Sequence, residues 1–94
     1  MISRTRSKLQ TEKKCYYTES YNNLTEHHIF NGAYRKKSDI DGFVIWVTFE
    51  EHDKLHSTAE GVKKRLELKR IAQEIYERDH TREEFIKRYG KSYL

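Results

Sequence analysis

The spacing of hydrophobic and polar positions changes character near Phe49. Just before that residue, the stretch 43–49 combines β-branched and aromatic side chains, which predicts a strand whose start is marked by Gly42. A shorter apolar run at 23–30 ends at the turn signal Asn31-Gly32 and predicts the partner strand. This part of the chain is therefore expected to form a β-hairpin.

Beyond this point the pattern becomes helical. Three acidic residues follow almost at once, and they suit the first turn of a helix because negative charge stabilises a helix N-terminus. A longer helix is predicted from about Thr58 to Arg78. Its apolar residues recur at helical spacing and form a stripe suited to a core, with the first two extending it one turn back: Val62, Leu66, Leu68, Ile71, Ala72 and Ile75.

The last predicted helix begins at a capping box, in which Thr81 and Glu84 satisfy each other's backbone groups. Gly90 is expected to close it, and an apolar face lies between these ends: Phe85, Ile86 and Tyr89. A two-stranded hairpin is not stable alone in water, so these two C-terminal helices are expected to brace it. The sequence thus predicts an α+β fold.

Composition places these elements in one small folded domain. The chain has 94 residues, too few for a second core, and its 13% aromatic content is unusual for a disordered chain. No run of about 18 apolar residues exists in the sequence, so no membrane span is expected. The N-terminus lacks the apolar stretch of a secretory signal, and Cys15 is the single cysteine, which excludes an intramolecular disulfide. An intracellular protein is expected.

Positive charge is concentrated at the N-terminus. Residues 1–14 carry a local charge of +4, which equals the formal net charge of the whole chain, so residues 15–94 form a neutral domain. Such a segment predicts a flexible basic arm that binds DNA phosphates, because each neutralised phosphate releases a counterion. The alternative is a solvated terminus without function. The basic residues concerned are Arg4, Arg6, Lys8, Lys13 and Lys14.

Four of the five histidines fall in two clusters. His27 and His28 are adjacent at the end of the shorter predicted strand, so their side chains point to opposite faces. His52 and His56 are four residues apart and share one side of the following helix. A helix that follows a hairpin can fold back across it, which would bring three imidazoles to one cation and leave the fourth close by.

That arrangement is suited to hydrolysis. A spare imidazole can take a proton from water, while a cation stabilises charge on a phosphate oxygen and on the leaving group. If the two clusters do not meet, the histidines are surface residues with no shared function.

The order of these features resembles the HNH, or ββα-metal, nuclease motif. The resemblance rests on "HHIFNG" with "YRKKSD", then "GFVIWV", then the helix with H-x-x-x-H, and on "LKRIAQEIYERD" and "REEFIKRYGKSYL" towards the C-terminus. Across residues 15–94 the chain is similar to small HNH-like proteins of phages and prophages. This implies a ββα-metal hairpin plus helix, braced by two C-terminal helices, in a phage- or prophage-encoded endonuclease acting in the cytoplasm of a bacterial host.

The resemblance assigns a role to each clustered histidine. His28 would be the general base that activates water, while His27, His52 and His56 would hold the metal. It implies one divalent ion, Mg²⁺, Mn²⁺, Ni²⁺ or Zn²⁺, and three imidazoles favour a transition metal because Mg²⁺ prefers oxygen ligands. DNA is the expected partner. The loop between the strands supplies the expected phosphate contacts, for which an ordinary solvated turn is the alternative: Arg35, Lys36 and Lys37.

The chain departs from the motif at its middle Asn. That residue would lie near Phe43, where its amide would orient the base, but positions 42 and 43 are Gly and Phe. A backbone carbonyl is the expected substitute partner for His28. The departure supports an alternative function, a catalytically inactive HNH-fold module that binds DNA or a protein partner without cleavage. A homodimer would be a way to cut both strands.

Overall fold

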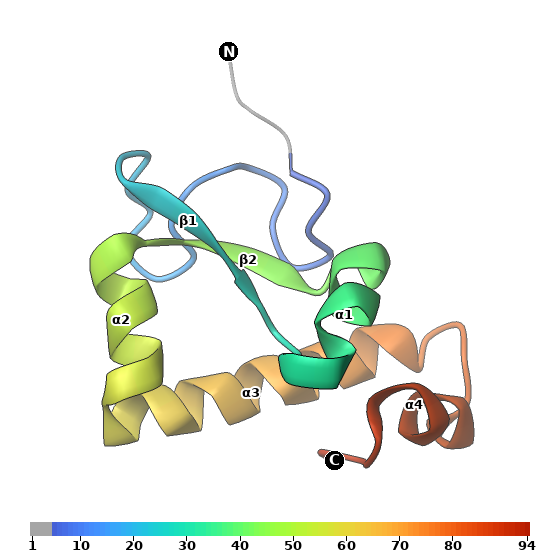
Figure 1. Cartoon of the computed structure of the whole chain (residues 1–94). Coiled ribbons are helices and arrows are strands. Elements are labelled where there is room, and N and C mark those ends of the chain that lie inside the picture. The colour runs from blue at the N-terminus through green and yellow to red at the C-terminus, as the bar shows by residue number, and fades with distance from the viewer. Residues whose placement is uncertain (1–4) are drawn as a thin grey trace.

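A two-stranded antiparallel sheet lies at the centre of the computed structural model, which describes residues 5–94 (Figure 1). Its strands are β1 (Leu24–His28) and β2 (Val44–Thr48), and their register sets His27 opposite Ile45. Both predicted strands are confirmed. β2 contributes most to the interior, as expected for a strand rich in β-branched and aromatic side chains.

Helical segments surround this hairpin and give the chain its α+β class. Two of them lie between the two strands, and the other three follow β2 in sequence (Figure 1). Within residues 5–94, none is both long enough and apolar enough to cross a membrane. The segments are η1 (Gly32–Tyr34), α1 (Arg35–Asp41), α2 (Phe49–Ser57), α3 (Ala59–Tyr76) and α4 (Arg82–Tyr89).

The connection between the strands was predicted to be a loop, but the structure shows the helix α1 there. Ser38 explains its position, because this buried side chain donates to the carbonyl of Phe43 at 2.6 Å and accepts from the amide of Phe30 at 3.2 Å. Gly42 ends the helix with a φ of 75°, a left-handed conformation that favours glycine. These anchors come from residues outside the helix, so its own seven residues do not reveal it.

Helix α2 follows β2 without a connecting loop. The Thr48 side chain accepts from the backbone of Glu51 and caps the start of the helix, as the acidic first turn predicted. Thr58 ends α2 and also caps the start of α3 by accepting from Gly61. A Cβ atom on Gly61 would lie 2.2 Å from the carbonyl oxygen of Lys54, so α2 and α3 meet at a corner that requires glycine.

The C-terminal helices cover the hairpin, as predicted. Phe30, two residues beyond β1, stacks on Tyr89 of α4 with ring centroids 4.1 Å apart. Leu68 of α3 is fully buried in the same core. The predicted stripe on α3 is wrong in its first turns, because Val62 and Leu66 are 48% and 39% exposed. Burial near that end follows the close approach of α2 instead of the apolar spacing.

The described part of the N-terminal segment lies along β2. Ser7 is buried and its hydroxyl donates to a backbone carbonyl of β2. The Gln10 side chain accepts from a backbone amide of the same strand at 2.7 Å. The predicted flexible arm therefore makes defined contacts from Thr5 onward, and its first four residues lie outside the described part of the chain.

Candidate metal centre

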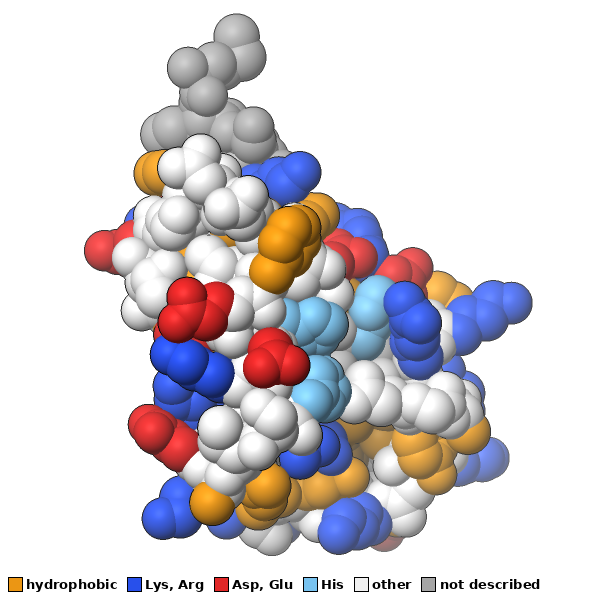
Figure 2. Space-filling model, turned by 60° about the vertical axis from the view of Figure 1, so that its left-hand side comes forward, with side chains coloured by type: hydrophobic (Ala, Val, Ile, Leu, Met, Phe, Trp, Pro, Cys, Tyr) orange, Lys and Arg blue, Asp and Glu red, His pale blue; other side chains and the backbone are white. Residues whose placement is uncertain are grey.

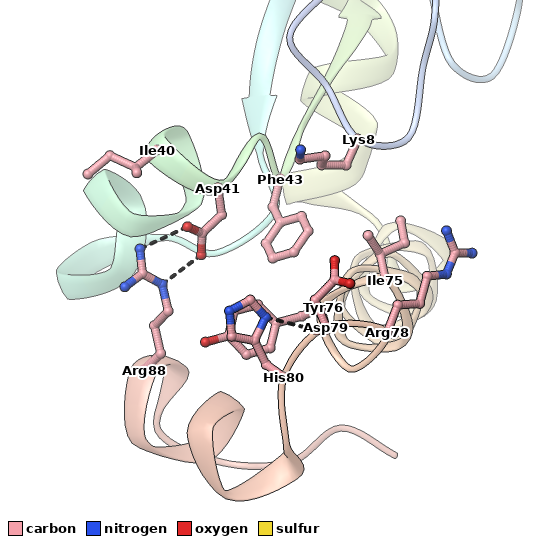
Figure 3. Close-up of a pocket in the computed structure, with 10 residues that line it drawn as sticks. All are labelled: Lys8, Ile40, Asp41, Phe43, Ile75, Tyr76, Arg78, Asp79, His80 and Arg88. Atoms are coloured by element: carbon pink, nitrogen blue, oxygen red, sulfur yellow. Dashed lines mark hydrogen bonds and ion pairs between the residues drawn. The ribbon is translucent and has the colours of Figure 1, made fainter.

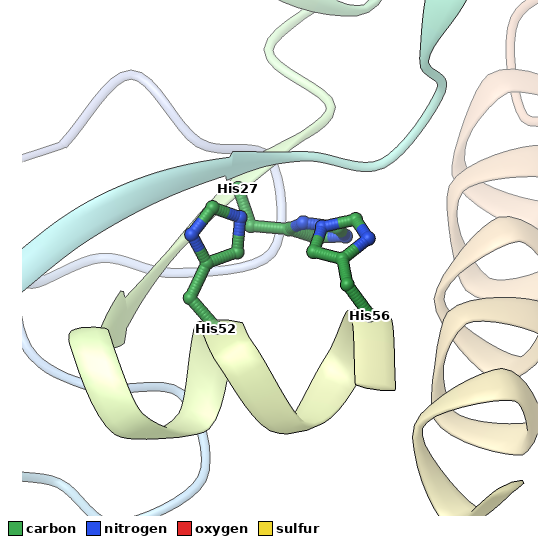
Figure 4. A group of neighbouring side chains, drawn as sticks. All are labelled: His27, His52 and His56. Atoms are coloured by element: carbon green, nitrogen blue, oxygen red, sulfur yellow. The ribbon is translucent and has the colours of Figure 1, made fainter. Parts of the chain in front are cut away.

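Three imidazoles meet between β1 and α2 (Figure 4). His27 points from β1 towards the helix, and His52 and His56 stand one turn apart on the facing side of α2. The ring centroid of His27 lies 5.4 Å from each of the other two, which are 5.0 Å from each other. One potential ligand nitrogen from each ring lies within 4.8 Å of the others. The two histidine clusters of the sequence therefore meet in space.

His27 is the buried member of this cluster. Its side chain is 2% exposed, and its Nε2 atom has no hydrogen-bond partner among the described residues. Burial, together with the nearby charges of His52, His56 and Arg65, lowers the pKa of His27 to about 3. The ring is therefore neutral at physiological pH, with an unpaired nitrogen in the interior. A buried polar atom without a partner is costly, and coordination of a cation would satisfy it.

The donor set fits a transition metal. Burial and the neighbouring His56 also lower the pKa of His52, so at least two of the three rings are held in the neutral form that binds metal. A tetrahedral ion with bonds of about 2.1 Å needs its nitrogen ligands about 3.4 Å apart. His56 is exposed and His52 half-buried, so both rings have room to close on an ion. Histidine side chains reach the surface together near the centre of the face shown in Figure 2.

His28 points to the opposite side of β1 from His27. Its Nε2 atom lies 2.9 Å from Oδ1 of Asp39, a residue of α1. The expected partner was a backbone carbonyl, so that prediction is corrected: a carboxylate from the unforeseen helix takes this place. The His28 contact is the first cause of a lowered pKa at Asp39, and Arg6 lowers it as well.

Arg6 completes this second group of side chains. Its Nη2 atom lies 2.8 Å from Oε1 of Glu26 and 2.7 Å from Oδ1 of Asp39. Potential ligand atoms of Glu26, His28 and Asp39 also lie within 4.8 Å of one another, but here the guanidinium already compensates both carboxylates. A residue of the N-terminal segment therefore belongs to the site itself, which the sequence pattern alone did not indicate.

The basic residues predicted to contact DNA from the connection between the strands lie on α1. Arg35 and Lys36 are exposed and form no ion pair with another described residue. Lys37 is half-buried, and its Nζ atom donates to the carbonyl of Arg88 at 3.2 Å. Two of the three therefore present free positive charge to solvent, whereas Lys37 also ties α1 to α4.

The remaining predicted contacts lie in the N-terminal segment. Lys8 is exposed. Lys13 stands over the ring of Trp46, with 4.3 Å between Nζ and the ring centroid, and Lys14 forms an ion pair of 2.9 Å with an acidic residue five positions later. Arg4 lies outside the described residues.

Arg65 is a candidate that sequence reasoning missed. It lies on α3 close enough to His27 for its charge to lower the pKa of that imidazole. Its Nε atom is buried and has no partner among the described residues. No local signal distinguishes this arginine, since it lies within a run of basic residues on a helix surface. It places a positive charge near His27, the buried member of the cluster.

A separate hollow lies between α1, the start of β2, the C-terminal end of α3 and α4 (Figure 3). Its volume is about 510 Å³, and its aromatic wall includes Tyr76 and His80, stacked with centroids 4.1 Å apart. None of the four clustered histidines lines it. Arg88 and Asp41 form a bidentate ion pair at its edge, so the hollow borders α1 but not the metal centre.

No known family model, curated protein or solved structure matches this chain.

Proposed function

We propose that this chain is a metal-dependent endonuclease of the ββα-metal type, which hydrolyses DNA phosphodiester bonds with His28 as general base. One observation carries the proposal: β1 and α2 bring His27, His52 and His56 together, and β1 presents a fourth imidazole on its other face. In chain order the elements are strand, strand and ligand-bearing helix, with α1 inserted between the strands. This is the order of the HNH motif.

The chain's own residues divide the reaction between two neighbouring groups. A divalent ion held by His27, His52 and His56 would stabilise negative charge on a phosphate oxygen and on the leaving group. His28 takes a proton from water, and the water oxygen attacks phosphorus as the bond to the leaving oxygen breaks. Its side chain is 10% exposed, so the ring is held close to the protein instead of moving freely in solvent.

Positive charge near the site suits a nucleic-acid substrate. Arg65 lies near His27, while Arg35 and Lys36 extend from the helix that carries Asp39. Contacts of this kind position phosphates without reading sequence. Binding should therefore weaken steeply as salt rises, in proportion to the number of phosphates neutralised.

A second candidate function has its own supporting observation. Positions 42 and 43 provide no amide to orient the base, and Val62 and Leu66 expose apolar surface on α3. A domain that keeps the metal as a structural element and binds DNA or a protein partner without cleavage would have these features. It predicts metal binding in the absence of hydrolysis.

Plasmid cleavage by metal-stripped protein separates the two. Mg²⁺, Mn²⁺, Ni²⁺ and Zn²⁺ are added back singly, and ion binding is measured in parallel by calorimetry. We expect cleavage with at least one ion, its loss in His28→Ala, and unchanged cleavage in His80→Ala, a histidine outside the site. Ion binding without cleavage would favour the binding module, and cleavage by His28→Ala at the wild-type rate would remove His28 as the base.

A further inference from the structure

We propose that Asp39 is the positioning residue of His28, whose ring it holds so that Nδ1 is the atom that accepts the proton from water. The inference rests on the proposed endonuclease function and deepens it. Asp39, on α1, would supply the orienting contact that the HNH motif takes from an amide side chain near positions 42 and 43, where this chain has Gly and Phe.

The contact between the two side chains fixes the tautomer of the ring. Oδ1 of Asp39 lies 2.9 Å from Nε2 of His28. An ionised carboxylate only accepts hydrogen bonds, so the proton of the neutral imidazole must reside on Nε2. Nδ1 then carries the free lone pair that a general base needs, and the ring can no longer rotate about its axis without losing the bond.

Arg6 holds the carboxylate in this position. Its Nη2 atom donates to the same Oδ1 atom at 2.7 Å, and its Nη1 atom donates to the backbone carbonyl of Asp39, also at 2.7 Å. The same Nη2 atom also donates at 2.8 Å to Oε1 of Glu26 on β1, next to His27 in sequence. A charge-assisted grip on both the side chain and the backbone keeps Asp39 ionised and restrains its rotamer.

The helix that carries Asp39 is itself fixed on both sides of that residue. Ser38 is buried and bonded to backbone groups at the ends of both strands. Asp41 accepts from Nε and Nη2 of Arg88 at 2.6 and 2.8 Å (Figure 3). It also accepts from the hydroxyl of Tyr89 at 2.5 Å. α1 is thus tied to the sheet by one residue and to α4 by another. A half-exposed aspartate on this short helix therefore has a defined position.

The same atoms argue against a second cation site. Glu26, His28 and Asp39 have suitable donor atoms, but Arg6 already provides the positive charge between the two carboxylates. This group therefore serves to accept a proton at His28, and the cation belongs with the three imidazoles on the other face of β1.

Kinetics of Asp39 variants test the proposal with the ion that supports cleavage. Asp39→Ala should lower kcat about 10- to 100-fold, by analogy with the loss when the hydrogen-bond partner of a metal-ligating histidine is removed, and leave KM and ion affinity unchanged. Asp39→Asn keeps an acceptor oxygen and should lose less. In the His28→Ala background, Asp39→Ala should cause no further loss, because Asp39 acts only through that ring. Asp79→Ala, an exposed acidic residue elsewhere, is the matched control.

The positioning role would be overturned by a rise in KM or a loss of ion affinity as large as the loss in kcat. A further loss of kcat in the double variant would overturn it as well. A second readout does not depend on cleavage. Nitrogen-15 NMR of the metal-free protein, recorded at a pH at which the His28 ring is neutral, should show the Nε2–H tautomer of His28, and Asp39→Ala should lose that preference. If the wild-type protein fails to cleave DNA but shows the tautomer, the proposed function fails and the positioning contact stands. If Asp39→Ala keeps the same tautomer population, the inference is wrong whatever the activity.

Discussion

Acidifying the metal-free protein should weaken its fold through His27. Burial, with the charges of His52, His56, Arg65 and His28, lowers the pKa of this imidazole from 6.5 to about 3. The unfolded chain therefore binds the proton more tightly than the folded protein does. This part of the stability is fully present above pH 6.5 and is lost progressively as the pH falls towards 3. One pH unit in that window is worth about 1.4 kcal/mol, so going from pH 7 to pH 5 should cost about 2 kcal/mol.

Urea unfolding with a chelator present measures this dependence. Trp46, the sole tryptophan, lies on β2 and provides the fluorescence signal. The range between pH 7 and pH 5 isolates the histidines, because carboxyl groups whose pKa is lowered from 4.5, such as Glu77 and Glu84, titrate below it. The pKa of His52 is lowered as well, so it adds a loss of the same sign.

Two variants decide whether His27 is responsible. His27→Leu replaces the buried ring by an apolar side chain that cannot titrate, and it should lose most of the pH dependence. His80→Gln changes an exposed histidine outside the cluster and should keep the wild-type slope. The same slope in His27→Leu as in the wild-type protein would refute the reasoning.

Four further results are expected. Zn²⁺ at 100 times its dissociation constant should raise the unfolding free energy by about 2.7 kcal/mol; thermal melts that show the same gain in His52→Ala would exclude that ligand. Phe30→Ala should remove about 3–5 kcal/mol because the ring is buried in the core, and a smaller loss in urea unfolding would contradict its central place. Thr81→Ala removes the capping box of α4 and should cost about 1 kcal/mol by the same assay, with no cost if the cap is unimportant. Gly61→Ala should reduce both stability and ion affinity, since the new Cβ would lie 2.2 Å from the carbonyl oxygen of Lys54. If calorimetry showed wild-type ion affinity, the corner between α2 and α3 would not be what sets the positions of the ligands.

The features that the sequence predicted are those with local signatures. β2 follows from its run of β-branched and aromatic side chains, and α4 from its capping box. The convergence of the histidines was foreseeable because a strand end and the H-x-x-x-H spacing each fix the direction of their side chains. The strand and helix signatures needed only residues a few positions apart, and the meeting of His27 with His52 and His56 required in addition that α2 fold back across the hairpin.

The features that escaped prediction depend on residues far apart in sequence. Asp39 meets Arg6 across 33 positions, and α1 is held through Asp41 by Arg88, 47 positions away. No pattern within α1 announces either contact. Val62 was misplaced for a related reason, since helical spacing identifies a stripe but not which stretch of it another helix covers.

The corner at Thr58 makes the metal centre sensitive to chain length. One residue ends α2 and starts α3, and α2 begins directly where β2 stops, so the ligand-bearing helix has no slack at either end. Inserting a single residue within α2 would rotate everything beyond it by about 100°, which would turn one imidazole of the H-x-x-x-H pair away from the other. Tags and insertions are better placed in the exposed turn at 21–22, ahead of Asn23, whose carbonyl accepts from the amide of Phe49 at the start of α2.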